Sequence, residues 1–336
     1  MDSFAHKSDL RVVTIGGGTG SFTLLNDFKR YFANLTAIVN MADSGGSTGQ
    51  LRDELGVLPP GDVRQCLVAL SDSPKVRDLF NYRFDEGSLA GHSFGNLFLT
   101  ALEKLTGNFA EAVETASEVL NVNGRVIPAT LDNVQLKMSW QDKQVVLDGE
   151  KVIDVEVFQH DPRQATLSLE PAAQANPAAL GAIAQADIVV LAPGDLYTSL
   201  GPILIADGFK QALETTNATV VYVCNLVTKQ GQTDGFRVAD HVAEIERFIG
   251  APAIDVLLYN TAKPADDLLE KYAKAGEKWV DAAPETLVDQ HFRAVGGDFL
   301  SHMPSPSEPT KGDALAAHRT LIRHNGEAVA KKLLTL

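Results

Sequence analysis

A run of small residues, Gly16-Gly17-Gly18-Thr19-Gly20, follows a short β-branched apolar segment and precedes a stretch with helical spacing. Glycines let the backbone approach a ligand closely, and the first turn of a helix offers unpaired amides and a partial positive charge to a phosphate. Residue 21 is serine, so the run departs from G-x-G-x-x-G, and no Gly-Lys-Ser/Thr of a P-loop follows. The pattern indicates an anion-binding turn, with a plain tight turn as the alternative.

A second small-residue loop begins at Asp43, ends at Arg52 and contains Gly45, Gly46 and Ser47. In dinucleotide-binding folds an acid at the end of the second strand holds a ribose, and Asp43 lies near that position. Two amide-rich loops with an arginine suit a ligand that carries more than one anionic group. A mobile surface loop is the alternative.

Two further motifs open helices. In Pro59-Pro60-Gly61-Asp62-Val63-Arg64, Asp62 is either only a helix cap or a ligand for a metal or a sugar. In Gly91-His92-Ser93-Phe94-Gly95-Asn96, His92 can donate to an anion or act as an acid or base. A lone histidine is more often structural, so both interpretations of His92 stay open.

Two polar clusters directly follow buried-type strands at residues 188–191 and 220–224. Hydroxyls and free amides at a helix start make a polyol or phosphate site, and ligands of open α/β sheets collect beyond the carboxyl ends of the strands. Each cluster also fits a plain strand-to-helix turn. The candidate ligand residues in these clusters are Gly194, Tyr197, Thr198, Ser199, Asn225 and Thr228. Four of the six motifs follow predicted strands, which favours one extended site.

The elements that position these residues alternate between strand and helix, which predicts a mostly parallel sheet covered on both faces. We therefore expect an α/β, Rossmann-like, three-layer αβα fold and one large domain over residues 8–336. The predicted strands are 11–15, 35–39, 188–191, 220–224 and 254–258, and the predicted helices are 21–32, 63–70, 94–105, 108–120 and 313–334. Asn108 is expected to cap its helix.

Residues 125–170 differ in character from the rest. The runs 134–138 and 153–157 alternate apolar and polar residues, and Asp148-Gly149 is a turn signal. These patterns predict a small, antiparallel, β-rich insertion within the domain.

Composition excludes several classes of protein. The 336 residues carry a net charge of −14, which argues against broad nucleic-acid binding, and no apolar run is long enough to span a membrane. Two distant cysteines and the lack of a signal peptide predict a reducing, cytoplasmic location. A homodimer is the default oligomer. Five histidines, at positions 160, 291, 302, 318 and 324, are expected to be solvated.

Taken in order, the six motifs resemble those of the gluconeogenesis factor family, the YvcK-like proteins, which is related to 2-phospho-L-lactate transferase. The resemblance covers about residues 12–260, and Asp240-His241 also fits it. It implies a Rossmann-like fold and a nucleotide-sugar ligand of the UDP-N-acetylglucosamine type, with no tightly bound organic cofactor. It also implies a role in cell shape and wall-precursor supply under gluconeogenic growth, without a settled reaction.

The transferase branch implies the alternative, an enzyme that moves a phospholactyl group from a nucleotide donor to a deazaflavin with magnesium. Asp43 or Asp62 would hold the metal, Arg52 or Arg64 would neutralise the donor phosphates, and His92 would carry a proton. The first loop and Asp43 also suggest a nicotinamide-dependent dehydrogenase, which the interrupted glycine pattern disfavours.

One departure from the family pattern concerns the metal. Two adjacent acids are usual in the family where this chain has Asp43-Ser44. A single carboxylate leaves magnesium bound mainly through phosphates and water. This departure argues against a magnesium site built entirely from protein ligands.

Overall fold

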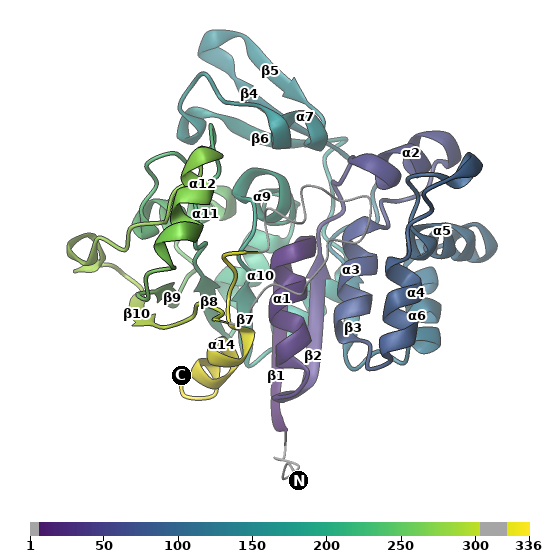
Figure 1. Ribbon diagram of the computed structural model, residues 1–336, viewed down its shortest axis with the longest axis horizontal. Helices are drawn as coiled ribbons and strands as arrows, with labels where there is room; N and C mark the ends of the chain where they lie inside the picture. The colour runs from purple at the N-terminus through teal and green to yellow at the C-terminus, as the bar shows by residue number, and fades with distance from the viewer. Residues whose placement is uncertain (1–6, 303–320) are drawn as a thin grey trace.

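The computed structural model describes residues 7–302 and 321–336. Its main sheet has seven strands in the order β10-β9-β8-β7-β1-β2-β3, and all of these pairings are parallel (Figure 1). The chain order reverses between β1 and β7, the kind of position at which open α/β sheets bind ligands. The strands are β1 (Ser8–Gly16), β2 (Phe32–Val39), β3 (Arg125–Pro128), β7 (Ile188–Leu191), β8 (Thr219–Val223), β9 (Val256–Asn260) and β10 (Arg293–Gly297).

The strands form because their apolar, β-branched residues are buried on both faces of the sheet, as in parallel sheets generally. Ile15 lies opposite Ile38 on one side and Leu191 on the other, and all four residues of β7 are buried. The predicted α/β fold with a mostly parallel sheet is confirmed.

Helices cover both faces and complete the three layers. On one face, Leu24 and Phe28 of α1 pack with Val63 and Leu67 of α3. The helices of this face are α1 (Gly18–Phe28), α3 (Gly61–Leu70), α4 (Pro74–Asn81), α5 (Phe94–Thr106), α6 (Phe109–Leu120) and α14 (Gly326–Leu333). The Asn108 side chain accepts hydrogen bonds from the amides of residues 110 and 111, so the predicted cap is confirmed.

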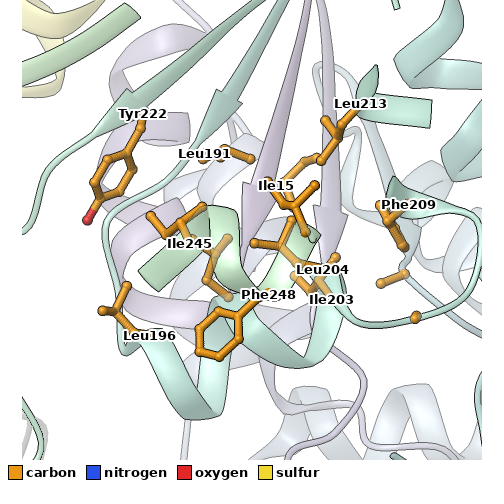
Figure 2. Packing of buried hydrophobic residues seen from close by; sticks show 14 of the residues in the cluster. Ile15, Leu191, Leu196, Ile203, Leu204, Phe209, Leu213, Tyr222, Ile245 and Phe248 are labelled. Carbon is orange, nitrogen blue, oxygen red and sulfur yellow. The ribbon is translucent and has the colours of Figure 1, made fainter. Parts of the chain in front are cut away.

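The opposite face packs a second core in which Ile15 and Leu191 of the sheet meet Leu204, Phe209 and Ile245 (Figure 2). Its helices are α8 (Pro177–Gln185), α9 (Gly201–Leu204), α10 (Phe209–Thr215) and α11 (Val238–Ile249). Two further helices, α2 (Gly46–Leu55) and α12 (Asp266–Lys274), lie nearer the ends of the strands. No helix in the described ranges has the length and apolar character needed to cross a membrane.

A separate antiparallel sheet, in the order β5-β4-β6, forms the insertion on the side where the main strands end (Figure 1). It contains β4 (Gln135–Trp140), β5 (Val145–Asp148) and β6 (Thr166–Glu170), and the short helix α7 (Glu150–Val155). Residues 125–128 of the predicted insertion form β3 of the main sheet instead. The strand predicted at 153–157 is wrong, because Gly149 turns the chain at φ 99° into α7, which buries only Ile153.

The C-terminal helix is shorter than the one predicted at 313–334. Residues 313–320 of that prediction lie outside the described residues. In the described part, Asn325 caps α14 by accepting a hydrogen bond from the amide of Ala328, so the helix begins at Gly326. Residues 321–324 precede it as a separate segment, and residues 322–324 line a pocket near the loops after β1, β7 and β8.

Candidate functional site

A pocket of about 350 Å³ lies where the loops after β1, β7 and β8 meet. This volume suits a small-molecule ligand. Five of the six predicted motifs contribute to its lining. The predicted residues that line it are Gly17, Gly18, Thr19, Gly20, Asp43, Asp62, Gly194, Thr198, Ser199, Asn225 and Thr228.

The loops after β1 and β7 are in direct contact. A Cβ atom at Gly20 would lie only 1.6 Å from the carbonyl oxygen of Pro193, and one at Gly17 would lie 2.9 Å from Ser199. The capping position of α1 is Gly17, which provides no side-chain cap. The first turn of α1 therefore borders the pocket, and its Gly18 amide donates to the Asp62 carboxylate instead of to a cap.

Asn225 joins the loop after β8 to the loop after β7. Its Nδ2 donates to the carbonyl oxygen of Gly194 at 2.7 Å, and its Oδ1 accepts from the Gly194 amide at 3.3 Å. Further along, the Thr228 amide donates to the Lys278 carbonyl at 2.7 Å, and the Thr228 hydroxyl accepts from the Lys278 amide. The pocket wall is thus held by hydrogen bonds between neighbouring loops.

The charged side chains that line the pocket are mostly acidic. In the described lining, the side chains of Lys229 and Arg323 are cationic. The carboxylates outnumber them and are Asp43, Asp62, Glu150, Asp154, Asp195 and Glu277. A cleft lined by one sign of charge concentrates ions of the opposite sign. The pocket therefore favours cations over a bare diphosphate.

Asp62 and Asp43 lie deep in the pocket. Burial, together with the charge of Asp43, raises the pKa of Asp62 to about 7, although the Gly18 amide and the Asn40 side chain oppose the shift. Burial also raises the pKa of Asp43, against hydrogen bonds from the Gly45 amide and Thr48. A Cβ atom at Gly18 would lie 2.6 Å from Asp62 Oδ1, so this carboxylate packs directly against the glycine loop.

Glu150 reaches the same region from the insertion. Burial, and next the charge of Asp43, raise the pKa of Glu150 to about 8. These carboxylate oxygens are the donors that Mg²⁺ prefers. Within residues 7–302 and 321–336, no three His, Cys, Asp or Glu side chains are arranged to hold a metal ion. The residues fit an ion held by one or two carboxylates and completed by phosphate and water.

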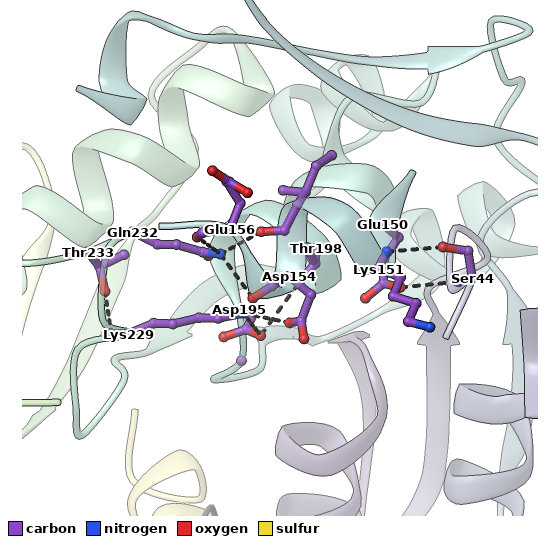
Figure 3. A network of polar contacts seen from close by, with 12 residues as sticks. Ser44, Glu150, Lys151, Asp154, Glu156, Asp195, Thr198, Lys229, Gln232 and Thr233 are labelled. Carbon is purple, nitrogen blue, oxygen red and sulfur yellow. Dashed lines mark hydrogen bonds and ion pairs between the residues drawn. The ribbon is translucent and has the colours of Figure 1, made fainter. Parts of the chain in front are cut away.

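Lys229 holds α7 against the core (Figure 3). Its Nζ lies 2.5 Å from Asp154 Oδ1 in the insertion and 2.8 Å from Asp195 Oδ2 after β7. Gln232 Nε2 also donates to the carbonyl oxygen of Ile153 at 2.6 Å. These contacts fix the insertion as one side of the pocket.

Another group of predicted site residues forms a separate polar cluster, which we call the Ser47–Arg64 network. His92 Nδ1 lies 3.0 Å from Ser47 Oγ, which accepts from Asn96 Nδ2 at 3.2 Å. Arg64 Nε donates to Asn96 Oδ1 at 3.0 Å, and Arg64 Nη1 donates to Asn81 Oδ1 at 2.6 Å. Burial lowers the pKa of Arg64 to about 10. The side chains of this network lie outside the pocket lining.

The remaining predicted residues also lie outside the lining. They are Gly16, Gly45, Gly46, Arg52 and Tyr197. Arg52 Nη1 donates to the carbonyl oxygen of Val134 at 3.4 Å, at the base of the insertion. Tyr197 is fully buried, and its ring contacts Phe158 and Phe248 edge-on, so it belongs to the core.

Sequence reasoning missed the segments that complete the pocket. Glu150 and Asp154 come from the insertion, and His324 comes from the segment before α14. His324 was expected to be solvated, but it is buried, and its Nε2 donates to the carbonyl oxygen of Cys224 at 3.0 Å. Burial lowers its pKa to about 4. No local pattern connects residues that lie a hundred positions apart.

Comparison with known proteins identifies relatives over most of the chain. Residues 12–300 match the family model "2-phospho-L-lactate transferase CofD". The chain is 36% identical to the gluconeogenesis factor of Bacillus subtilis, covering 97% of this chain and 98% of that protein. It is 40% identical over 302 residues to a Thermotoga maritima protein that carries the same name provisionally, covering 89% and 93% of the two chains.

A solved structure agrees with the fold. The crystal structure of a UPF0052 family protein from Bacillus halodurans superposes with a TM-score of 0.86 at 34% sequence identity. The match covers 98% of this chain and 100% of that one.

Proposed function

We propose that the pocket binds a nucleotide sugar of the UDP-N-acetylglucosamine type. The premise is that the chain belongs to the 2-phospho-L-lactate transferase CofD family and, within it, to the gluconeogenesis factors. One observation carries this proposal: the loops after β1, β7 and β8 meet at the reversal of strand order in a single pocket. Nucleotides bind at this position in related folds.

The lining suits the parts of such a ligand. The first-turn amides of α1 beyond Gly18 can donate to a phosphate oxygen, as helix N-termini do. Thr198, Ser199 and Thr228 supply hydroxyls at strand ends, and hydroxyls and amides are the groups that recognise sugars and ribose. Because the carboxylates of the lining would repel a diphosphate, a cation bound between them would favour binding.

Isothermal titration with UDP-N-acetylglucosamine and Mg²⁺ tests the proposal. We expect binding to the wild-type chain and no binding to Gly20→Val, whose side chain would displace the Pro193 loop. The matched control is Gly181→Ala, where a Cβ meets nothing within 4 Å. If the wild-type chain gives neither heat nor a thermal shift with millimolar ligand, the nucleotide-sugar proposal fails.

The alternative is a transferase that moves a phospholactyl group from a nucleotide donor to a deazaflavin, and the family model supports it. Turnover of a guanosine- or uridine-diphospho donor with a deazaflavin acceptor would establish it. His92, the proposed proton carrier, lies in the Ser47–Arg64 network rather than in the pocket lining. Unchanged turnover in His92→Ala would remove that role.

The wider role follows from the proposed ligand. We propose that the protein acts in the cytoplasm, as a homodimer, and links wall-precursor supply to cell shape under gluconeogenic growth. Cys66 and Cys224 are free and buried, in keeping with a reducing compartment. Light scattering of the purified chain tests the dimer, and the shape of deletion cells on a gluconeogenic carbon source tests the cellular role.

A further inference from the structure

Glu150 belongs to the insertion, yet its carboxylate reaches the loop that follows β2. Its Oε2 accepts from the Ser44 amide at 3.2 Å, and the Lys151 amide donates to Ser44 Oγ at 3.0 Å (Figure 3). Asp43 Oδ1 accepts from the next amide, that of Gly45, at 2.8 Å. Two consecutive amides of one loop therefore hold the carboxylates of Glu150 and Asp43 close together.

Independent contacts fix the position of Glu150. At the other end of α7, Asp154 pairs with Lys229, and the carbonyl oxygen of Ile153 accepts from Gln232. Lys229 is also held by Asp195, away from the Ser44 loop. The helix thus places one carboxylate on Lys229 and presents another beside Asp43.

The backbone packs closely around Asp43, and both Asp43 and Glu150 line the pocket. A Cβ atom at Gly61 would lie 2.7 Å from Asp43 Oδ2, and one at Gly45 would lie 3.3 Å from Asp43 Oδ1 and 4.0 Å from Glu150 Oε2. Glycine at both positions therefore lets the backbone lie against the carboxylates without a side chain that would displace them. Like charges held together in a partly desolvated site favour a cation between them.

We propose that Glu150, together with Asp43, binds a divalent cation of the Mg²⁺ class that connects the protein to the phosphates of the ligand, an inference that rests on the proposed function. Mg²⁺ typically takes one or two carboxylates and completes its shell with substrate phosphates and water. Glu150 thereby supplies a ligand that Ser44, with its hydroxyl engaged by the Lys151 amide, does not supply.

The test uses the full chain and Mn²⁺ as the probe, with free Mn²⁺ followed by electron paramagnetic resonance, alone and with UDP-N-acetylglucosamine. We expect Glu150→Gln to weaken Mn²⁺ affinity by about tenfold or more, because a charged ligand is lost. The glutamine oxygen can still accept from the Ser44 amide, so the insertion stays docked. The matched control, Glu156→Gln, changes a carboxylate of the insertion outside the pocket lining and should bind Mn²⁺ as the wild type does.

A second variant separates charge from folding. Ser44→Asp combined with Glu150→Gln returns a carboxylate to the loop and should recover most of the lost Mn²⁺ affinity. Mn²⁺ binding by Glu150→Gln at wild-type strength, or no Mn²⁺ binding by the wild type, would overturn the metal proposal. Calorimetry with the nucleotide sugar in EDTA and in Mg²⁺ tells the two proposals apart. Sugar binding without any contribution of Glu150 removes only the cation site, whereas no sugar binding in either buffer removes the proposed function.

Discussion

Two polar regions near the carboxyl ends of the strands differ in how their charges are satisfied. In the pocket, Asp43, Asp62 and Glu150 lie close together, and each has a raised pKa because of burial. In the Ser47–Arg64 network, the buried guanidinium of Arg64 is held by two neutral amide oxygens. Buried polar groups that are hydrogen-bonded stabilise a fold, whereas like charges held close together favour the binding of an ion of opposite charge. We therefore expect the network to be structural and the pocket to bind a ligand.

The largest effect is expected at Arg64. Arg64→Leu removes the donors for the side-chain oxygens of Asn96 and Asn81 and should lower the free energy of unfolding by about 3 kcal/mol. Urea denaturation measures this change. The control is Arg30→Leu, which breaks an exposed ion pair with Asp27 and should cost less than about 1 kcal/mol.

The same variant can break the comparison. If Arg64→Leu keeps wild-type stability but loses binding of UDP-N-acetylglucosamine, Arg64 contacts the ligand, as the sequence suggested, and the network is part of the site.

A smaller, pH-dependent effect is expected at His324. This residue lines the pocket, but its side chain is hydrogen-bonded to the protein, as the side chains of the network are. Its pKa in the folded chain, about 4, lies below its ordinary value of 6.5, so the unfolded chain binds more protons between these values. The stability that neutral His324 contributes is complete above about pH 6.5 and is lost as the pH falls towards 4.

His324→Gln removes this titration while keeping a donor for the Cys224 carbonyl. The stability of the wild type relative to the variant should therefore fall by about 2 kcal/mol between pH 7 and pH 4.5. Urea denaturation of both proteins at the two pH values measures this difference. A constant difference would mean that His324 titrates normally and is not sealed in the pocket wall.

The elements with strong local signals could be predicted from the sequence. Apolar runs such as 188–191 predicted the buried strands, and Asn108 predicted the start of α6, because burial pattern and capping act over a few residues. The alternation at 153–157 predicted a strand, but α7 forms there. The turn at Gly149 and the contacts of α7 with the Lys229 loop determine the local structure, and neither can be read from the alternation.

The residues of the candidate site likewise divide into those that local sequence predicted and those that only tertiary packing brings in. The glycine loop and the polar turns after β7 and β8 were predicted because their loops follow strands directly. Glu150 and His324 were not, because tertiary packing brings them in from the insertion and from the segment before α14. The Ser47–Arg64 network carries polar residues of the kinds found in ligand sites, and only the structure shows that they bond to one another.

The smallest effect is expected at Lys229, and it should be local rather than global. Lys229→Met removes the cation between Asp154 and Asp195 but leaves both cores of the main sheet intact. Because these ion pairs are partly exposed, their loss should cost about 1 kcal/mol, which increases local opening about fivefold. Hydrogen exchange should therefore speed up in residues 135–170 and remain unchanged in β1 and β7. Exchange that rises equally in all strands would show that Lys229 supports the whole fold. The pocket would then contribute to global stability as the Ser47–Arg64 network does, and the contrast between the two regions would no longer hold.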